Sequence, residues 1–422
     1  MATIAGHGSR RTVAGYDRFP DRHSVAKSPR IIVYCSLFPS AAAPTAGTFI
    51  RERMFRVARR LPLVVVAPQP WSPFDALVRR FRPGFRPMAI EHETMDGVEV
   101  HRPRFFSLPG LLKRFDGWFM ARATLPAVRR IHERFGATLV DAHFLYPDGW
   151  AATRIGRALG LPVTITIRGS KDEWLVDTDR RGHLVEAMRS ATRLFAVSQA
   201  LVRNVVERLG IDSAKVSVIG NGVDLDKFAP VDRAEARRRL GIAESAKVLI
   251  GVGNLIPTKG FQRVIPLLPA LRARHPGLLF LIVGGGASQG DMRGELEALA
   301  REHGVADAVR LCGRQPHEAL KWYYGAADVF AQATEFEGWS NVLLEAMACG
   351  LPVVTTRVGG NAEVVASPAV GELVDWWDAE KFRDAVDRAL ARDWDRQAII
   401  AYARANTWDA RIERLVQEFE RI

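Results

Sequence analysis

The chain has 422 residues, which is too long for one ordinary hydrophobic core and predicts two domains of roughly 200 residues each. Hydrophobic residues make up 48% of the chain and charged residues 25%, which excludes a disordered or fibrous protein and favours a soluble, globular one. A net charge of +12 suits an anionic partner. Nucleic acid is not expected as that partner, because no recognition-helix, zinc-finger or RNA-binding pattern accompanies the charge.

The N-terminal segment and the cysteines bear on where the protein is expected to act. Residues 1–29 are rich in Gly, Ser and Arg without an apolar core, and we expect a disordered leader rather than a signal peptide. No run approaches the roughly 18 apolar residues of a spanning helix. Cys35, Cys312 and Cys349 are far apart and odd in number, which predicts reduced, buried thiols in a cytoplasmic protein.

One stretch near the N-terminus mixes aromatic with basic residues. Such a mixture suits the headgroup level of an anionic bilayer, and it predicts peripheral attachment to the inner face of the cytoplasmic membrane. A solvated basic loop accounts for the same pattern equally well. The residues are Trp71, Phe74, Arg79, Arg80, Phe81, Arg82, Phe85 and Arg86.

From Arg30 onward, short apolar strands alternate with helical patterns, which is typical of parallel sheets with helices on both faces. The first predicted strand, residues 31–35, leads through a loop to Gly47 and a helix for which Thr48 is the expected N-cap. An Asn-Gly turn at 221–222 then closes a first domain over residues 30–224. Its other predicted strands lie at 63–67, 97–101, 162–167, 195–198 and 216–219, with one more ending at His143, and a helix is predicted at 199–210.

Two side chains stand at the carboxyl ends of predicted strands, the edge that faces the ligand crevice of an open parallel sheet. His143 is one; the alternative is a histidine that only caps its strand or bonds a loop carbonyl. Arg168 is the other, and it could bind phosphate bidentately or pair with Asp172 or Glu173. The acidic triplet at 177–179 has no strand before it, so we expect no metal site there.

The second domain, expected over residues 225–405, opens with an Arg-rich helix at 232–240 and a strand at 248–252. Lys259 follows in a Gly-bounded loop one turn before a helix, where an ammonium group meets phosphate or is merely exposed. The glycines at 284–286 lack the spacing of a dinucleotide fingerprint. Further strands are predicted at 278–283, 309–314 and 328–332, and later helices at 378–392 and 407–419.

A segment beginning at Glu337 combines an acidic loop, a short helix with Ser340 as N-cap candidate, a stop at Gly350 and a buried strand from Pro352. The unpaired first-turn amides and the helix dipole favour an anion, while Glu337 and Glu345 can accept hydrogen bonds from hydroxyls. A diphosphate between two hydroxylated rings would use all these groups. The segment therefore predicts a nucleotide-sugar site, although two glutamates eight apart carry little information alone.

Residues 337–354, followed by 359–365 and 371–374, resemble the motif of two glutamates separated by seven residues in the retaining glycosyltransferases of family four. The resemblance extends from Arg30 to the C-terminus and is strongest over residues 248–374. It implies the GT-B fold of the α/β class. That fold has two doubly wound, Rossmann-like parallel-sheet domains, an N-terminal one for the acceptor and a C-terminal one for the nucleotide sugar, with a cleft between them. A final helix, residues 406–422, would cross back to the first domain.

The resemblance also implies roles for residues. Lys259 and the amides at the start of the helix would bind the diphosphate, Glu345 the ribose, Glu337 the transferred sugar and His143 an outer hydroxyl of that sugar. The helix start comprises Ser340, Asn341, Val342 and Leu343.

Two positions depart from the family pattern. Asn254 stands where the family usually has an arginine that meets the diphosphate, so Arg168 or Arg314 could replace that charge. Gly47 is the single glycine where a pair usually approaches the donor phosphate or the acceptor.

The activity that follows is transfer of a hexosyl unit from a UDP- or GDP-sugar to an acceptor hydroxyl, with retention at the anomeric carbon. No metal or other cofactor is expected, since Lys259 and a helix N-terminus take the electrostatic role. We expect a lipid-linked or polysaccharide acceptor in cell-surface polysaccharide or glycolipid assembly. The alternative is a non-transferring GT-B protein that binds nucleotide sugar as a scaffold or an epimerase. A phosphorylase would need a Schiff-base lysine, to which no motif points.

Overall fold

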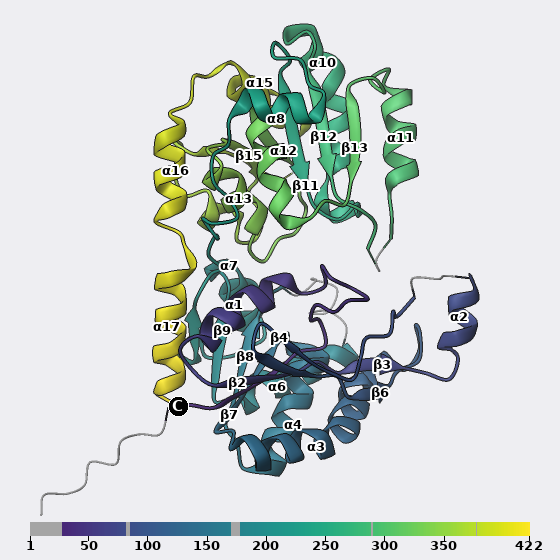
Figure 1. Ribbon diagram of the computed structural model, residues 1–422, viewed down its shortest axis with the longest axis vertical. Helices are drawn as coiled ribbons and strands as arrows, with labels where there is room; N and C mark the ends of the chain where they lie inside the picture. Colours follow the sequence, from purple (N-terminus) through teal and green to yellow (C-terminus); the bar gives the residue numbers. More distant parts are fainter. Residues whose placement is uncertain (1–27, 82–84, 170–177, 288–289, 377) are drawn as a thin grey trace, which may run out of the picture.

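The computed structural model describes residues 28–81, 85–169, 178–287, 290–376 and 378–422. Predictions for most of the leader, for Arg82 and for Asp172, Glu173 and Asp177 lie outside these residues. Figure 1 shows two sheets with their helices, one in the lower half of the view built from the N-terminal part of the chain, the other in the upper half. The predicted fold class, two Rossmann-like domains built on parallel sheets, is confirmed.

The lower sheet contains eight strands, and all neighbours are parallel except β4 and β5. Its central strands are short Val- and Ile-rich runs buried on both faces, because helices cover both sides. In spatial order the strands are β10 (Val216–Val218), β9 (Arg193–Ala196), β8 (Val163–Ile167), β7 (Leu139–His143), β1 (Ile31–Tyr34), β2 (Leu63–Val66), β5 (Val98–His101) and β4 (His92–Met95).

The upper sheet contains six parallel strands in the order of a dinucleotide-binding fold, 3-2-1-4-5-6. The sequence order reverses between β11 and β14, which are neighbours in the centre of the sheet. The strands are β13 (Val309–Gly313), β12 (Leu279–Val283), β11 (Val248–Val252), β14 (Val329–Gln332), β15 (Val353–Thr356) and β16 (Gly371–Val374).

Helices connect the strands. Asp232, Asp378 and Asp395 each accept a hydrogen bond from a first-turn amide of the helix that follows, as N-caps do. Within the described ranges no helix is both long and apolar enough to cross a bilayer. The helices are α1 (Thr48–Ala58), α2 (Asp75–Phe81), α3 (Asp116–Phe135), α4 (Trp150–Leu159), α6 (Thr178–Ser190), α7 (Gln199–Leu201), α8 (Arg233–Leu240), α9 (Phe261–Val264), α10 (Leu268–Arg274), α11 (Arg293–Glu302), α12 (Leu320–Ala326), α13 (Asn341–Ala348), α14 (Asn361–Val364), α15 (Ala379–Ala391), α16 (Arg396–Arg404) and α17 (Trp408–Glu420).

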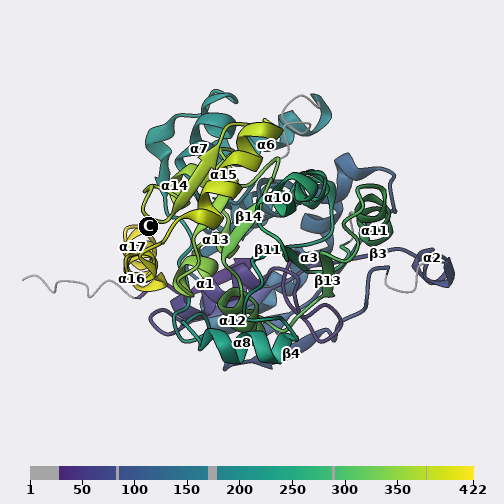
Figure 2. The ribbon, with the colours of Figure 1, turned by 90° about the horizontal axis from the view of Figure 1, so that it is seen from above.

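The last two helices run along one side of both domains (Figures 1 and 2). Ile399 of α16 belongs to the apolar core of the upper domain, whereas Trp408 and Phe419 of α17 belong to a core of the lower domain. The rings of Phe419 and Phe195 meet edge to face, 5.6 Å apart. This side of the molecule therefore ties the two domains together.

Four sequence expectations need correction. The N-cap of α1 is Gly47 in the left-handed conformation, not Thr48. The helix expected at 199–210 is helical only to Leu201 and continues as a wider π turn to Glu207. Cys312 is half-buried, not buried. Trp71, the first residue of the basic aromatic stretch, lies not in a loop but in β3 (Gln69–Trp71), which pairs with β6 (Arg104–Phe106) in a separate two-stranded sheet.

Candidate active site

Four of the candidate residues lie at the two places where strand order reverses. In open parallel sheets a crevice forms there, beyond the carboxyl ends of the strands. In the upper domain the loops after β11 and β14 carry Lys259 and Glu337. In the lower domain the reversal is between β1 and β7, and the segments there carry Gly47 and His143. The sheet topology therefore brings together residues that the sequence places far apart.

Lys259 and Glu337 form an ion pair, with 2.6 Å between Nζ and Oε2. Their side chains are 22% and 16% exposed, so a ligand can reach both. Gly260 holds the lysine loop against the other loop: its φ is 76°, and a Cβ there would lie 1.8 Å from the carbonyl oxygen of Ala333. The pair offers a cation and a carboxylate side by side, suited to phosphate and hydroxyl respectively.

Glycines allow the Glu337 loop to pass between two other segments. The amide of Gly360 donates to the carbonyl oxygen of Glu337 at 3.1 Å. A Cβ on Gly359 would lie 1.7 Å from that same oxygen, and one on Gly338 would lie 2.0 Å from the carbonyl oxygen of Arg168 in the lower domain. The loop therefore contacts both domains.

Glu345 is 7% exposed and fully partnered on α13. Tyr324 donates its hydroxyl to Oε2 at 3.1 Å, and Nε2 of His317 lies 3.5 Å from Oε1. Burial disfavours a charged imidazole, but the hydrogen bond and charge of Glu345 outweigh it and raise the pKa of His317. Neither partner was predicted from the sequence. The signal for His317 was its place just after β13, at the crevice edge of the sheet.

The first turn of α13 is joined to the lower domain. Ser340 occupies the N-cap position, but its side chain makes no capping hydrogen bond. Asn341 instead accepts a hydrogen bond from the amide of Asn221 at 3.0 Å through its Oδ1. Val342 is half-buried and Leu343 is buried, so these two contribute backbone amides to the turn. Asn221 thus orients the helix N-terminus from across the domain junction.

On the opposite side, His143 ends β7 as predicted, but its ring is fully buried. Arg168 donates from Nε to Nδ1 of His143 at 3.2 Å, which leaves Nε2 as the protonated nitrogen, 3.5 Å from Oδ2 of Asp141. Burial, followed by the nearby arginine charges, lowers the pKa of His143, so the ring is neutral. Burial also raises the pKa of Asp141 to about 6.

Four polar atoms of this cluster are buried without a protein hydrogen-bond partner: Nη2 of Arg53, Oδ2 of Asp141, Nε2 of His143 and Nη2 of Arg168. Each such group costs about 1–3 kcal/mol while it stays unpaired. Arg168 also contacts Asn221 at 3.4 Å and lies over the ring of Phe49. A ligand hydroxyl or phosphate oxygen admitted here would find several donors.

The three remaining candidates lie around the loops of the crevice. Gly47 has a φ of 64°, and a Cβ there would lie 2.1 Å from the carbonyl oxygen of Leu37, so glycine is required. Arg314 is exposed and bridges the domains, donating to Oγ1 of Thr45 at 2.9 Å and to the carbonyl of Gly286 at 2.7 Å. Asn254 is exposed in the loop after β11. Of the two arginines that could supply its missing charge, Arg314 is open to solvent and Arg168 is buried.

A small cavity of about 40 Å³ lies at the domain junction next to Glu345. This volume holds about three water molecules, so a nucleoside entering it must displace side chains. The residues that line it come from α1, the interdomain connection, the upper domain and the start of α17: Thr48, Phe49, Glu52, Gly222, Val223, Asp224, Lys227, Phe228, His317, Asn341, Glu345 and Trp408.

Solved structures share this architecture over nearly the whole chain. Sucrose-phosphate synthase from Thermosynechococcus elongatus superimposes with a TM-score of 0.73 at 21% identity, covering 94% of this chain and 99% of that one. The Anabaena protein HepE in complex with UDP-glucose gives 0.69 at 19% identity, covering 93% and 100%. At these identities the likeness concerns the fold, and the fold is that of the GT-B glycosyltransferases.

Sequence comparisons define the family. The model described as Glycosyltransferase Family 4 matches residues 46–227, and the one described as Glycosyl transferases group 1 matches residues 232–406. A D-inositol 3-phosphate glycosyltransferase from Actinosynnema mirum is 37% identical over 81% of this chain and 84% of its own length. Its counterpart from Mycobacteroides abscessus is 28% identical over 96% and 92%. The chain belongs to the group 1, family 4 glycosyltransferases.

Proposed function

We propose that this glycosyltransferase moves a hexosyl unit from a UDP- or GDP-sugar to an acceptor hydroxyl, with retention at the anomeric carbon and without a metal. The observation that carries the proposal is the pairing of Lys259 with Glu337 at the crevice of the upper domain. Buried Glu345 lies close by in sequence, on α13, the helix that follows Glu337. A solved neighbour of the same fold holds UDP-glucose, which supports a nucleotide sugar as the donor.

The electrostatics of the leaving group assign the roles. As the glycosidic bond breaks, the diphosphate gains negative charge and the sugar gains cationic character. Lys259 and the first-turn amides of α13 stabilise the diphosphate, which takes the lysine from its present partner. Glu345 accepts hydrogen bonds from the ribose hydroxyls, and Glu337, freed from Lys259, accepts from the sugar. A fixed ammonium and a helix N-terminus supply the charge that a metal supplies elsewhere.

The lower domain completes the site. The side chains of His143 and Arg168 are buried in the lower domain, beneath the part of it that the Glu337 loop contacts. That contact is between Gly338 and the backbone of Arg168. For His143 to reach an outer hydroxyl of the sugar, the Arg168 side chain must turn away from it and pair with a phosphate or an acceptor group. Closure of the domains around the substrates would then exclude water and limit hydrolysis.

An exposed apolar surface on the lower domain supports a lipid-linked or membrane-bound polysaccharide acceptor. Ser107 joins its two parts, since its amide donates to the carbonyl of Trp71 and its hydroxyl accepts from Lys113. Figures 1 and 2 show α2, which belongs to it, standing out from the body of the molecule on the side away from α17. The surface comprises Trp71, Phe74, Leu77, Phe81, Leu111, Leu112, Phe115 and Trp118, each at least 40% exposed.

Basic groups around this surface suit an anionic bilayer, where aromatic and apolar side chains enter the headgroup boundary. Arg79 and Arg80 lie in the last turn of α2. The relatives' name suggests a second acceptor class, a phosphorylated inositol, which needs no membrane. The two classes differ in their dependence on vesicles.

The donor is tested first, with a thermal-shift panel of nucleoside-diphosphate sugars with and without magnesium. A donor at about 100 times its dissociation constant stabilises the protein by about 2.7 kcal/mol. We expect one donor to shift the wild type without metal and to lose its effect in Glu345→Ala. A protein that binds the donor but never transfers or hydrolyses it would instead be the non-transferring scaffold.

The acceptor is tested by radiolabel transfer from that donor to inositol phosphate and to a membrane lipid fraction. Sedimentation with vesicles containing anionic lipid should recover the wild type but not Phe74→Ser/Phe81→Ser/Leu111→Ser. Ile422→Ser, which alters an exposed apolar side chain outside this surface, is the control. Transfer to inositol phosphate with no preference for vesicles would remove the membrane from the proposal.

A further inference from the structure

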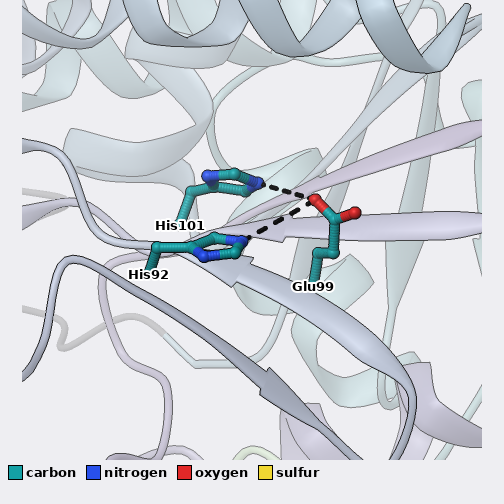
Figure 3. Close-up of side chains that lie close together, drawn as sticks. All are labelled: His92, Glu99 and His101. Carbon is teal, nitrogen blue, oxygen red and sulfur yellow. Dashed lines mark hydrogen bonds and ion pairs between the residues drawn. The ribbon is translucent and has the colours of Figure 1, made fainter.

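Three potential metal ligands converge on the β4–β5 hairpin, at the outer edge of the lower sheet (Figure 3). His92 and His101 are directly opposite each other in the antiparallel register. Glu99 precedes His101 by two residues, so its side chain emerges on the same face. The side chains of His92 and Glu99 are 53% and 44% exposed, so this face is open to solvent at the hairpin. The convergence thus follows from strand register, not from a chance meeting of loops.

The distances suit one small cation. Nε2 of His101 lies 3.2 Å and Nε2 of His92 lies 3.8 Å from the same oxygen of Glu99, Oε2. All three ligand atoms lie within 4.8 Å of one another. Around a tetrahedral zinc ion with bonds of about 2.0–2.2 Å, ligand atoms are roughly 3.3 Å apart. Small side-chain rotations would therefore bring the three atoms onto one ion.

We propose that His92, Glu99 and His101 bind a divalent transition metal such as Zn²⁺, with water in the fourth position. Two imidazoles and a carboxylate are ligands that zinc accepts, and two nitrogens disfavour Mg²⁺ or Ca²⁺, which prefer oxygen. Among the residues that the structure describes, this is the one group of three such side chains with converging ligand atoms.

One neighbouring cation competes with the metal. Nη2 of Arg134, in the last turn of α3, forms an ion pair with Oε2 of Glu99. The two side chains are 60% and 44% exposed, and pairs of this kind contribute little to stability. The metal takes the carboxylate and releases the arginine, which gives the site a signature that an unspecific histidine pair would lack.

The site is separate from the transfer reaction. The crevice loops follow β1, β7, β11 and β14, whereas this hairpin ends the sheet beyond β2. A bound metal would cross-link the edge strand to β5 and fix the hairpin turn, whose Asp96 pairs with Arg51 of α1. Its consequence is therefore stabilisation of this edge of the sheet, and transfer proceeds without it.

The test is a calorimetric Zn²⁺ titration of the untagged, full-length, chelator-treated protein, repeated with Co²⁺ by absorption. We expect the protein to bind one equivalent of metal ion, and its Co²⁺ form to show the intense visible absorption bands of a tetrahedral site. His92→Ala/His101→Ala should weaken binding by about 100-fold or more, since loss of an outer-shell partner alone costs about 10–100-fold. Glu99→Gln should weaken it less than the double variant does.

Two further variants serve as controls. His7→Ala/His23→Ala also removes two histidines and should bind as the wild type does. Arg134→Ala should bind more tightly, because the competing cation is gone. The proposal fails if the wild type binds no zinc, if the double variant at the hairpin binds normally, or if His7→Ala/His23→Ala loses the ion. Binding by Glu99→Gln as tight as that of the wild type would exclude Glu99 as a ligand. Metal-free thermal unfolding of each variant shows that the folds match.

Discussion

Polar groups on the two sides of the cleft are arranged differently. On the upper side, Lys259 pairs with Glu337, and Glu345 is held by Tyr324 and His317, so the charged groups have partners. On the lower side, the cluster around His143 is buried and retains four polar atoms without protein partners. The ionisable groups there are pushed toward their neutral forms: burial raises the pKa of Asp141 and lowers that of His143.

The difference indicates which side of the cleft can bind a ligand without rearranging. Under the proposed function, the upper side needs only an exchange of partners, in which a diphosphate replaces Glu337 on Lys259. The lower side must rearrange before His143 contacts a substrate, because its ring is covered. We infer that donor binding precedes the rearrangement, and that variants on the two sides fail at different steps.

The largest expected effect is on the upper side. Lys259→Ala removes the ammonium from the diphosphate and should lower kcat/KM about 100- to 1,000-fold, the usual cost of one preorganised electrostatic contact. Steady-state transfer assays measure it. Lys381→Ala, at a lysine 75% exposed on the same domain, should leave the rate unchanged. A loss below about tenfold would mean that another cation carries the diphosphate.

On the lower side, His143→Ala should lower kcat about 100-fold. Donor affinity should hold, because His143 itself is proposed to contact only the sugar, while Lys259, Glu345 and the first turn of α13 bind the rest of the donor. Isothermal titration with the donor, run beside the transfer assay, separates the two effects. A variant that bound donor ten times more weakly, with its chemistry intact, would show that both sides are formed before binding.

The pH dependence of stability tests whether burial also favours the neutral form of Asp148, another buried carboxyl group of the lower domain. Its carboxylate accepts hydrogen bonds from Ser36, yet burial raises its pKa from 3.8 to about 6. Because the folded state binds this proton more tightly, ionisation costs stability at pH 7, and the cost shrinks as pH falls through 6. Between pH 7 and 5 the wild type should gain about 1 kcal/mol that Asp148→Asn does not.

Chemical denaturation at several pH values measures that difference. Asp375→Asn, at a side chain 82% exposed, should follow the wild type. Parallel curves for the wild type and Asp148→Asn would mean that this carboxyl titrates alike in both states.

The smallest effect is expected where the two sides touch. Arg314→Ala breaks hydrogen bonds to Thr45 and Gly286 and removes an exposed charge, so the donor KM should rise only about two- to fivefold. A loss of more than about 100-fold would instead identify Arg314 as the cation that stands in for the family's arginine at Asn254.

Local pattern was sufficient for the elements and for much of the candidate site. Apolar runs a few residues long predicted most of the strands of both sheets, and the pattern after Glu337 predicted α13, its stop at Gly350 and the strand that follows. These features depend on residues adjacent in the chain, where propensity and periodicity act. The places that failed, such as the N-cap of α1, are ones where a distant backbone, here the carbonyl of Leu37, sets the conformation.

Only the tertiary structure decided which groups meet. Arg314 and Thr45 are 269 positions apart, and Asn221 and Asn341 are 120 apart, so no local pattern could pair them. The same holds for the partners of Glu345 and for the hydrogen bond that His143 accepts from the Arg168 side chain after the next strand. The sequence alone was enough to predict which functional groups stand at each strand end. The order of the strands then determined which of those ends share a cleft, because side chains from separate strands combine only where the sheet brings them together.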